Sequence, residues 1–157
     1  MNIKNAVDKK FESMTLKEIL KQPVYAIQGV SEGDAVLMKE AFRVSTVEQF
    51  AKIRFAKWAW AIQELAKFET DSGTTEGTLN IDNAVDKAYE KKTLKEILDS
   101  PMDALQGLSE RQAKLLYDAF QIKTVKQLAN QKYFLIARSI YFLALCEDPD
   151  SDPNTGI

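Results

Sequence analysis

The chain contains the same sequence twice, and this duplication constrains its fold more than any other feature. Residues 2–69 align with residues 80–147 at a constant offset of about 78 positions, and roughly 33 of the 68 aligned positions are identical, with no gap. Identity of this extent is far too high for two unrelated segments that share only a helical pattern. We therefore predict a tandem duplication of a roughly 68-residue helical domain, with repeat 1 at residues 1–69 and repeat 2 at residues 80–147.

The segments outside the repeats are polar. Residues 70–79 read TDSGTTEGTL, a composition rich in Gly and Thr that predicts an exposed linker. Residues 148–157 read DPDSDPNTGI, with two prolines and three aspartates, and we expect a disordered acidic tail there.

Each repeat is predicted to be all-α, because apolar residues recur at helical spacing and helix-capping residues precede each run. Gly29 and Gly107 stand where a helix is expected to close in the left-handed conformation. About five helices are expected in each repeat, and the last one is predicted as an unbroken run from 47 to 68 in repeat 1 and through 129–145 in repeat 2. The predicted N-caps of repeat 1 are Thr15, Ser31 and Thr46, and those of repeat 2 are Thr93, Ser109 and Thr124.

Composition removes several function classes. The chain has no histidine and a single cysteine, Cys146, so it has no His-based catalytic triad, none of the usual zinc or haem ligand sets and no internal disulfide. We expect a non-catalytic protein without metal or cofactor, in which Cys146 is a small core residue. A charged start after Met1 argues against a signal peptide, and the apolar run from Tyr133 to Cys146 is shorter than the roughly 20 residues that span a bilayer. We therefore expect a cytoplasmic location and no membrane contact.

One segment of each repeat resembles a known motif. AIQGVSEGDAVLMKEAF in repeat 1 and ALQGLSERQAKLLYDAF in repeat 2 resemble the helix-hairpin-helix motif. With FRVSTVEQFA and FQIKTVKQLA, which follow them, they are similar to the C-terminal domain of the bacterial RNA polymerase alpha subunit over roughly 30 of the 68 residues in each repeat. The resemblance implies a bacterial helical hairpin protein. In repeat 2 it implies that the turn could meet a nucleic-acid phosphate, and the residues concerned are Gly107, Ser109, Arg111 and Lys114. In repeat 1 the acidic Glu32 and Asp34 would repel a phosphate. The other interpretation is that both hairpins only help the repeats to pack.

The two repeats differ most in their last helix. The inner face is apolar in both, with Ala59, Ile62, Leu65 and Ala66 matched by Ala137, Ile140, Leu143 and Ala144. On the outer face, Lys57, Glu64 and Lys67 of repeat 1 are replaced by Leu135, Phe142 and Leu145, and Trp60 is replaced by Arg138. A helix that is apolar all round is either buried all round or carries a binding surface.

Two interpretations of this outer face stay open. It could dock on repeat 1, near Trp58 or Trp60, or it could be the interface with a protein partner or a second copy of the chain, with Trp60 as an aromatic anchor. The function predicted from the sequence is a non-catalytic protein–protein interaction or scaffolding module whose candidate contact residues are Trp60, Leu135, Arg138, Phe142 and Leu145. The alternative is a nucleic-acid-binding adaptor that uses the second hairpin.

Overall fold

The computed structural model describes residues 1–70 and 79–148. Within these ranges the chain is all-α: it forms helices and short 3-10 turns, with isolated bridge pairs but no strand. The predicted linker and tail lie almost entirely outside the described residues.

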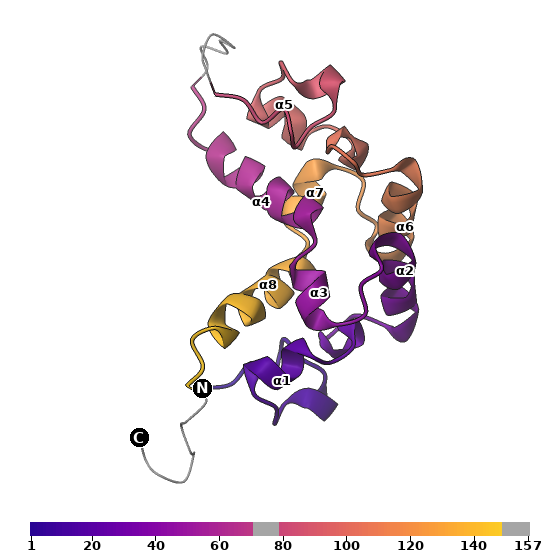
Figure 1. Ribbon diagram of the computed structural model, residues 1–157, viewed down its shortest axis with the longest axis vertical. Coiled ribbons are helices and arrows are strands. Elements are labelled where there is room, and N and C mark those ends of the chain that lie inside the picture. Colours follow the sequence, from indigo (N-terminus) through magenta and orange to yellow (C-terminus); the bar gives the residue numbers. More distant parts are fainter. Residues whose placement is uncertain (71–78, 149–157) are drawn as a thin grey trace.

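Equivalent elements occur in both repeats, in the same order (Figure 1). The elements of repeat 1 are η1 (Lys9–Phe11), α1 (Leu16–Leu20), η2 (Val24–Ala26), α2 (Glu32–Phe42), α3 (Val47–Ala51) and α4 (Arg54–Ala66). Those of repeat 2 are η3 (Lys87–Tyr89), α5 (Leu94–Leu98), η4 (Met102–Ala104), α6 (Glu110–Phe120), α7 (Val125–Ala129) and α8 (Lys132–Ala144).

The predicted helix starts are confirmed. Each predicted N-cap accepts a hydrogen bond from the backbone N–H three residues on, and the side chain of that third residue accepts one from the N-cap backbone. These reciprocal capping boxes satisfy backbone donors that a helix start otherwise leaves without partners. Gly29 and Gly107 have φ of 97° and 85°, as expected for left-handed positions.

The prediction of one unbroken final helix is wrong in both repeats. The chain turns between α3 and α4 at Lys52 and Ile53, and between α7 and α8 at Asn130 and Gln131. Neither turn contains Gly or Pro, the residues that usually mark a break. The turn carries the last helix away from the preceding one, so that its buried face meets other elements.

Those elements belong to the other repeat. Helix α4 packs against α5 and α7 of repeat 2, and α8 packs against α1 and α3 of repeat 1, as Figure 1 shows. The α2 helix of repeat 1 lies against α6 of repeat 2. The sequence repeats are therefore not the packing units: each half of the molecule is completed by a helix from the other repeat.

We call this arrangement, in which each last helix packs on the other repeat, the exchange. Two carboxylates form hydrogen bonds across it. The Glu147 carboxylate, just after α8, accepts hydrogen bonds from the backbone N–H groups of Leu16 and Lys17 at 2.7 and 2.9 Å. In the other half, the Glu69 carboxylate accepts equivalent bonds from Leu94 and Lys95 at 2.7 and 3.0 Å. Together with the capping boxes, these bonds satisfy the first four N–H groups of α1 and of α5.

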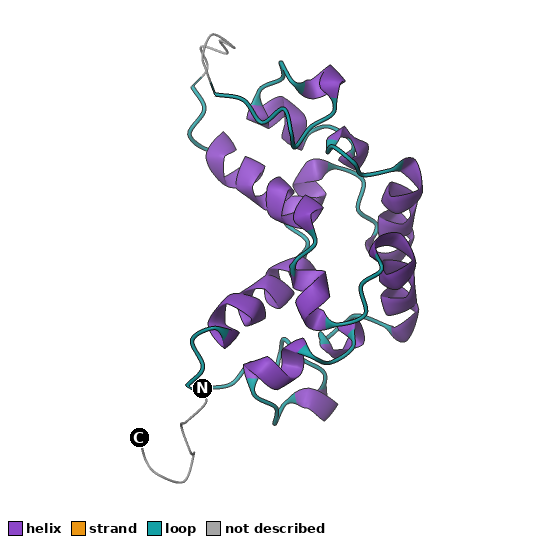
Figure 2. Cartoon of the chain, in the orientation of Figure 1, coloured by secondary structure: helices purple, strands orange, loops and turns teal. Residues whose placement is uncertain are grey.

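A single apolar core runs through both halves. It contains no buried polar or charged residue among those described, and its centre holds Phe50 of α3 stacked on Phe134 of α8, with ring centroids 4.3 Å apart. Figure 2 shows α4 and α8 diverging from this central region. Their divergence leaves part of each helix without a protein neighbour.

Candidate functional site

The inner face of α8 is largely as predicted. Ala137, Ile140 and Ala144 are buried, and they are buried against repeat 1. The first interpretation of α8 is that its outer face docks on repeat 1, but the face that is buried against repeat 1 is the inner one. Leu143 was predicted to be an inner residue and is instead 59% exposed, like its counterpart Leu65.

The outer face of α8 is only partly covered. Leu135 is half-buried and lines a shallow apolar groove with Ile3 and Leu16. Phe142 and Leu145 are 56% and 67% exposed. Leu143, which also lines the groove, is exposed as well. We call these three exposed apolar residues near the end of α8, Phe142, Leu143 and Leu145, the α8 surface. Cys146 beside it is exposed too, so its predicted place in the core is wrong.

The corresponding positions of α4 carry an ion pair. The Lys67 ammonium lies 2.9 Å from the Glu64 carboxylate, in an exposed i, i+3 pair. Glu64 corresponds to Phe142 and Lys67 to Leu145. The same two helix positions are thus charged in repeat 1, as Glu64 and Lys67, and apolar in repeat 2, as Phe142 and Leu145.

Trp60 and Arg138 meet each other. Their positions are equivalent in the two repeats, and the Arg138 guanidinium lies 4.6 Å from the centroid of the Trp60 ring, a cation–π contact between α4 and α8. Partial burial lowers the pKa of Arg138. In the described part of the chain this pair makes no ring contact or ion pair with Phe142 or Leu145. The five predicted residues therefore divide into this pair, Leu135 in its groove, and Phe142 and Leu145 of the α8 surface.

The second hairpin is surrounded by groups from repeat 1. The Arg54 guanidinium of α4 lies so close to Gly107 that a Cβ added there would be 2.8 Å from its Nη2. Arg111 pairs with Glu40 of α2 at 3.0 Å, and Lys114 pairs with Asp118 at 3.1 Å. Ser109 caps α6. Both predicted phosphate-binding cations therefore already have carboxylate partners.

Sequence reasoning missed Leu143 and Arg54. The helical pattern placed Leu143 on the inner face because it follows Ile140 by three residues, but at the end of α8 it is exposed, as Leu65 is at the end of α4. Nothing local to Arg54 indicated that it would reach the hairpin of the other repeat, about 53 positions away in the chain.

Two chemical features are absent from the described part of the chain. No group of three or more Cys, Asp or Glu side chains is placed to hold a metal ion there. No helix in residues 1–70 or 79–148 is long and apolar enough to cross a bilayer.

Comparison with protein-family models, with curated proteins and with solved structures finds no match to this chain.

Proposed function

We propose that the protein is a non-catalytic interaction module that binds a protein partner through the α8 surface, Phe142, Leu143 and Leu145. The observation that carries this proposal is the difference between the repeats. Because α4 keeps its place with the Glu64–Lys67 ion pair, the fold does not need apolar side chains at the equivalent positions of α8. Exposed Phe and Leu side chains at those positions gain free energy only when another molecule covers them.

The chain supplies its own control for a test. The double variant F142E L145K gives α8 the two side chains that α4 already carries, so we expect its unfolding free energy to stay within about 0.5 kcal/mol of the original protein. A matched surface variant, Glu64→Gln, alters α4 and leaves α8 unchanged.

Binding is then compared among the three proteins. We expect proteins retained on the immobilised original chain and on E64Q to be lost from F142E L145K, and any concentration-dependent rise in solution mass to disappear with the same variant. Equal retention and equal mass in all three would overturn the proposal.

The nucleic-acid alternative stays a prediction, and no contact favours it. Arg111 and Lys114 are paired with Glu40 and Asp118, so binding a phosphate would require those pairs to open. Retardation of duplex DNA at low salt that Arg111→Ala weakens would support the alternative.

A further inference from the structure

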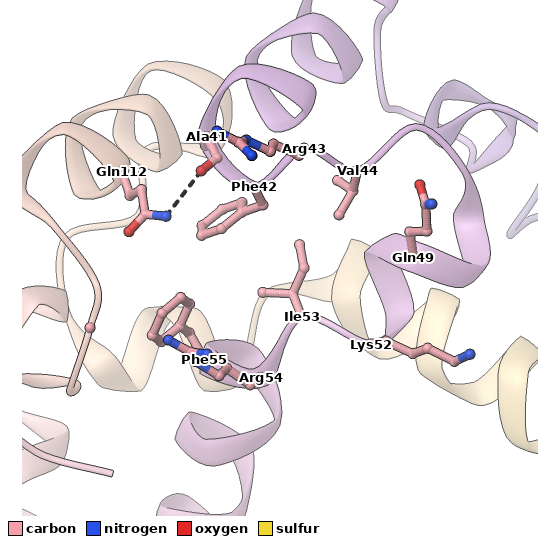
Figure 3. A pocket seen from close by; sticks show the side chains of 11 residues that line it. Ala41, Phe42, Arg43, Val44, Gln49, Lys52, Ile53, Arg54, Phe55 and Gln112 are labelled. Carbon is pink, nitrogen blue, oxygen red and sulfur yellow. Dashed lines mark hydrogen bonds between the residues drawn. The ribbon is translucent and has the colours of Figure 1, made fainter. Parts of the chain in front are cut away.

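An open pocket of about 430 Å³ lies between the end of α2, the start of α4 and the second hairpin. Figure 3 shows the contacting rings of Phe42 and Phe55 along one wall, with Ile53 beside them and Arg43 and Arg54 at opposite edges. The Phe42 and Phe55 ring centroids are 5.9 Å apart. The pocket therefore combines an apolar wall with two guanidinium groups.

Neither guanidinium is neutralised by a carboxylate in the described part of the chain. Arg54 stacks on the Phe55 ring at 4.8 Å and on the Trp58 ring at 5.6 Å, and ion pairs among the described residues include neither Arg43 nor Arg54. Glu48 pairs with Lys52, whose side chain extends away from the pocket in Figure 3, and Glu40 pairs with Arg111. Gln112 donates to the Ala41 carbonyl at 3.0 Å and closes one side.

The equivalent position in the other half carries less positive charge. There Arg43 is replaced by Gln121, Lys52 by Asn130 and Gln112 by the acidic Asp34, while Arg54 becomes Lys132. Phe55 becomes Tyr133, and its hydroxyl donates a hydrogen bond of 3.2 Å to the carbonyl of Gly29. Since both halves fold alike, the positive charges of Arg43 and Lys52 are not required for folding.

We propose that this pocket binds a small organic anion, a phosphate or carboxylate group attached to an apolar or aromatic body. A guanidinium presents several N–H donors in a planar fork that matches the oxygens of such a group. The half-buried Phe42 ring, with the small exposed parts of Ile53 and Phe55, would lie against one side of the apolar body. The proposal is independent of the α8 surface.

Phenyl phosphate is the probe for the test, titrated into the isotope-labelled full chain while backbone and arginine Nε–H signals are followed by NMR. We expect saturable shifts at Arg43, Arg54 and Phe55, with none at Gln121, Lys132 and Tyr133, which serve as an internal control. Phenol and inorganic phosphate at the same concentrations should each bind at least about tenfold more weakly, because phenol lacks the anionic group and inorganic phosphate lacks the aromatic ring.

Two variants built from the other half complete the test. Arg43→Gln and Gln112→Asp place in the pocket the residues found at Gln121 and Asp34, and both are compatible with the fold there. We expect each to raise the Kd of phenyl phosphate about tenfold or more, with unchanged spectra elsewhere.

The proposal is overturned if phenyl phosphate causes no saturable shift, if it shifts both halves equally, or if neither variant weakens it. It is also overturned if a short DNA duplex shifts the same residues while phenyl phosphate does not, since the site would then be a nucleic-acid surface.

Discussion

Glu147 accepts hydrogen bonds from two backbone N–H groups at the start of a helix 130 residues away in the sequence. Removing the carboxylate leaves Leu16 and Lys17 N–H without these partners, so Glu147→Ala should lower the unfolding free energy by about 1–2 kcal/mol. Urea denaturation measures the change. Glu12→Ala, which removes an exposed carboxylate that forms no ion pair with the described residues, should change it by less than about 0.5 kcal/mol. Equal losses in the two variants would contradict the capping role of Glu147.

The capping box of α5 gives stability a dependence on pH. A hydrogen bond from the Thr93 backbone N–H is the main cause that lowers the pKa of Glu96 below its ordinary value of 4.5, and Lys92 adds to it. A carboxyl whose pKa is lower in the folded state contributes stability above its unfolded pKa and loses it as the pH falls through the folded one. Stability should therefore decline less steeply below pH 4.5 in Glu96→Gln than in the original protein. Unfolding followed by circular dichroism at a series of acidic pH values checks this, and identical slopes would contradict it.

The first turn of a helix from the other repeat packs on each hairpin turn. The side chain that meets the hairpin glycine is the rigid Tyr133 ring in one half and the flexible Arg54 in the other. A Cβ at Gly29 would lie 2.6 Å from the Tyr133 hydroxyl, whereas at Gly107 it would lie 2.8 Å from the flexible end of Arg54. Both glycines have positive φ, which costs another residue about 1–2 kcal/mol. Gly29→Ala should consequently destabilise the protein more than Gly107→Ala in thermal unfolding.

The Tyr133 ring provides the control for this comparison. Tyr133→Phe removes the hydroxyl that a Cβ at Gly29 would meet, and Phe is the residue at the corresponding position, Phe55. Adding Tyr133→Phe should recover part of the stability lost in Gly29→Ala. No recovery, or equal losses at the two glycines, would show that the backbone conformation alone determines the cost.

The elements themselves could mostly be predicted, since their signals are local. Thr15 followed by Glu18, and Ser31 followed by Asp34, mark helix starts within four residues, and the structure has them there. The turn at Ile53 could not be predicted in this way. Ile53 precedes α4 and provides no side-chain cap, and it is buried because α4 packs on repeat 2. That packing is a tertiary interaction, so the residues next to Ile53 carry no signal for it.

At the scale of the whole molecule, the sequence similarity between residues 2–69 and 80–147 also concealed the packing. Because the repeats are so similar, Phe50 and Leu128, or Ile19 and Ile97, offer nearly equivalent docking surfaces to either last helix. The pattern on α8 thus indicates which face is buried but not which repeat buries it. The same ambiguity explains why the position of Arg54 beside Gly107 of the other repeat could not be predicted, whereas the apolar character of Phe142 and Leu145 is visible in the sequence alone.

The exchange predicts that two equivalent substitutions each perturb the other repeat. Ile140 of α8 is buried in the half formed by α1 and α3, and Ile62 of α4 in the half formed by α5 and α7. Either residue changed to Ala should lower the unfolding free energy by about 2–5 kcal/mol. In amide NMR spectra, Ile140→Ala should shift signals of Leu16–Leu20 and Val47–Ala51 in repeat 1, and Ile62→Ala should shift those of Leu94–Leu98 and Val125–Ala129 in repeat 2. If each substitution instead perturbed the short helices of its own repeat, the last helices would be packed without exchange, and the Glu69 and Glu147 caps would have to be formed within each repeat as well.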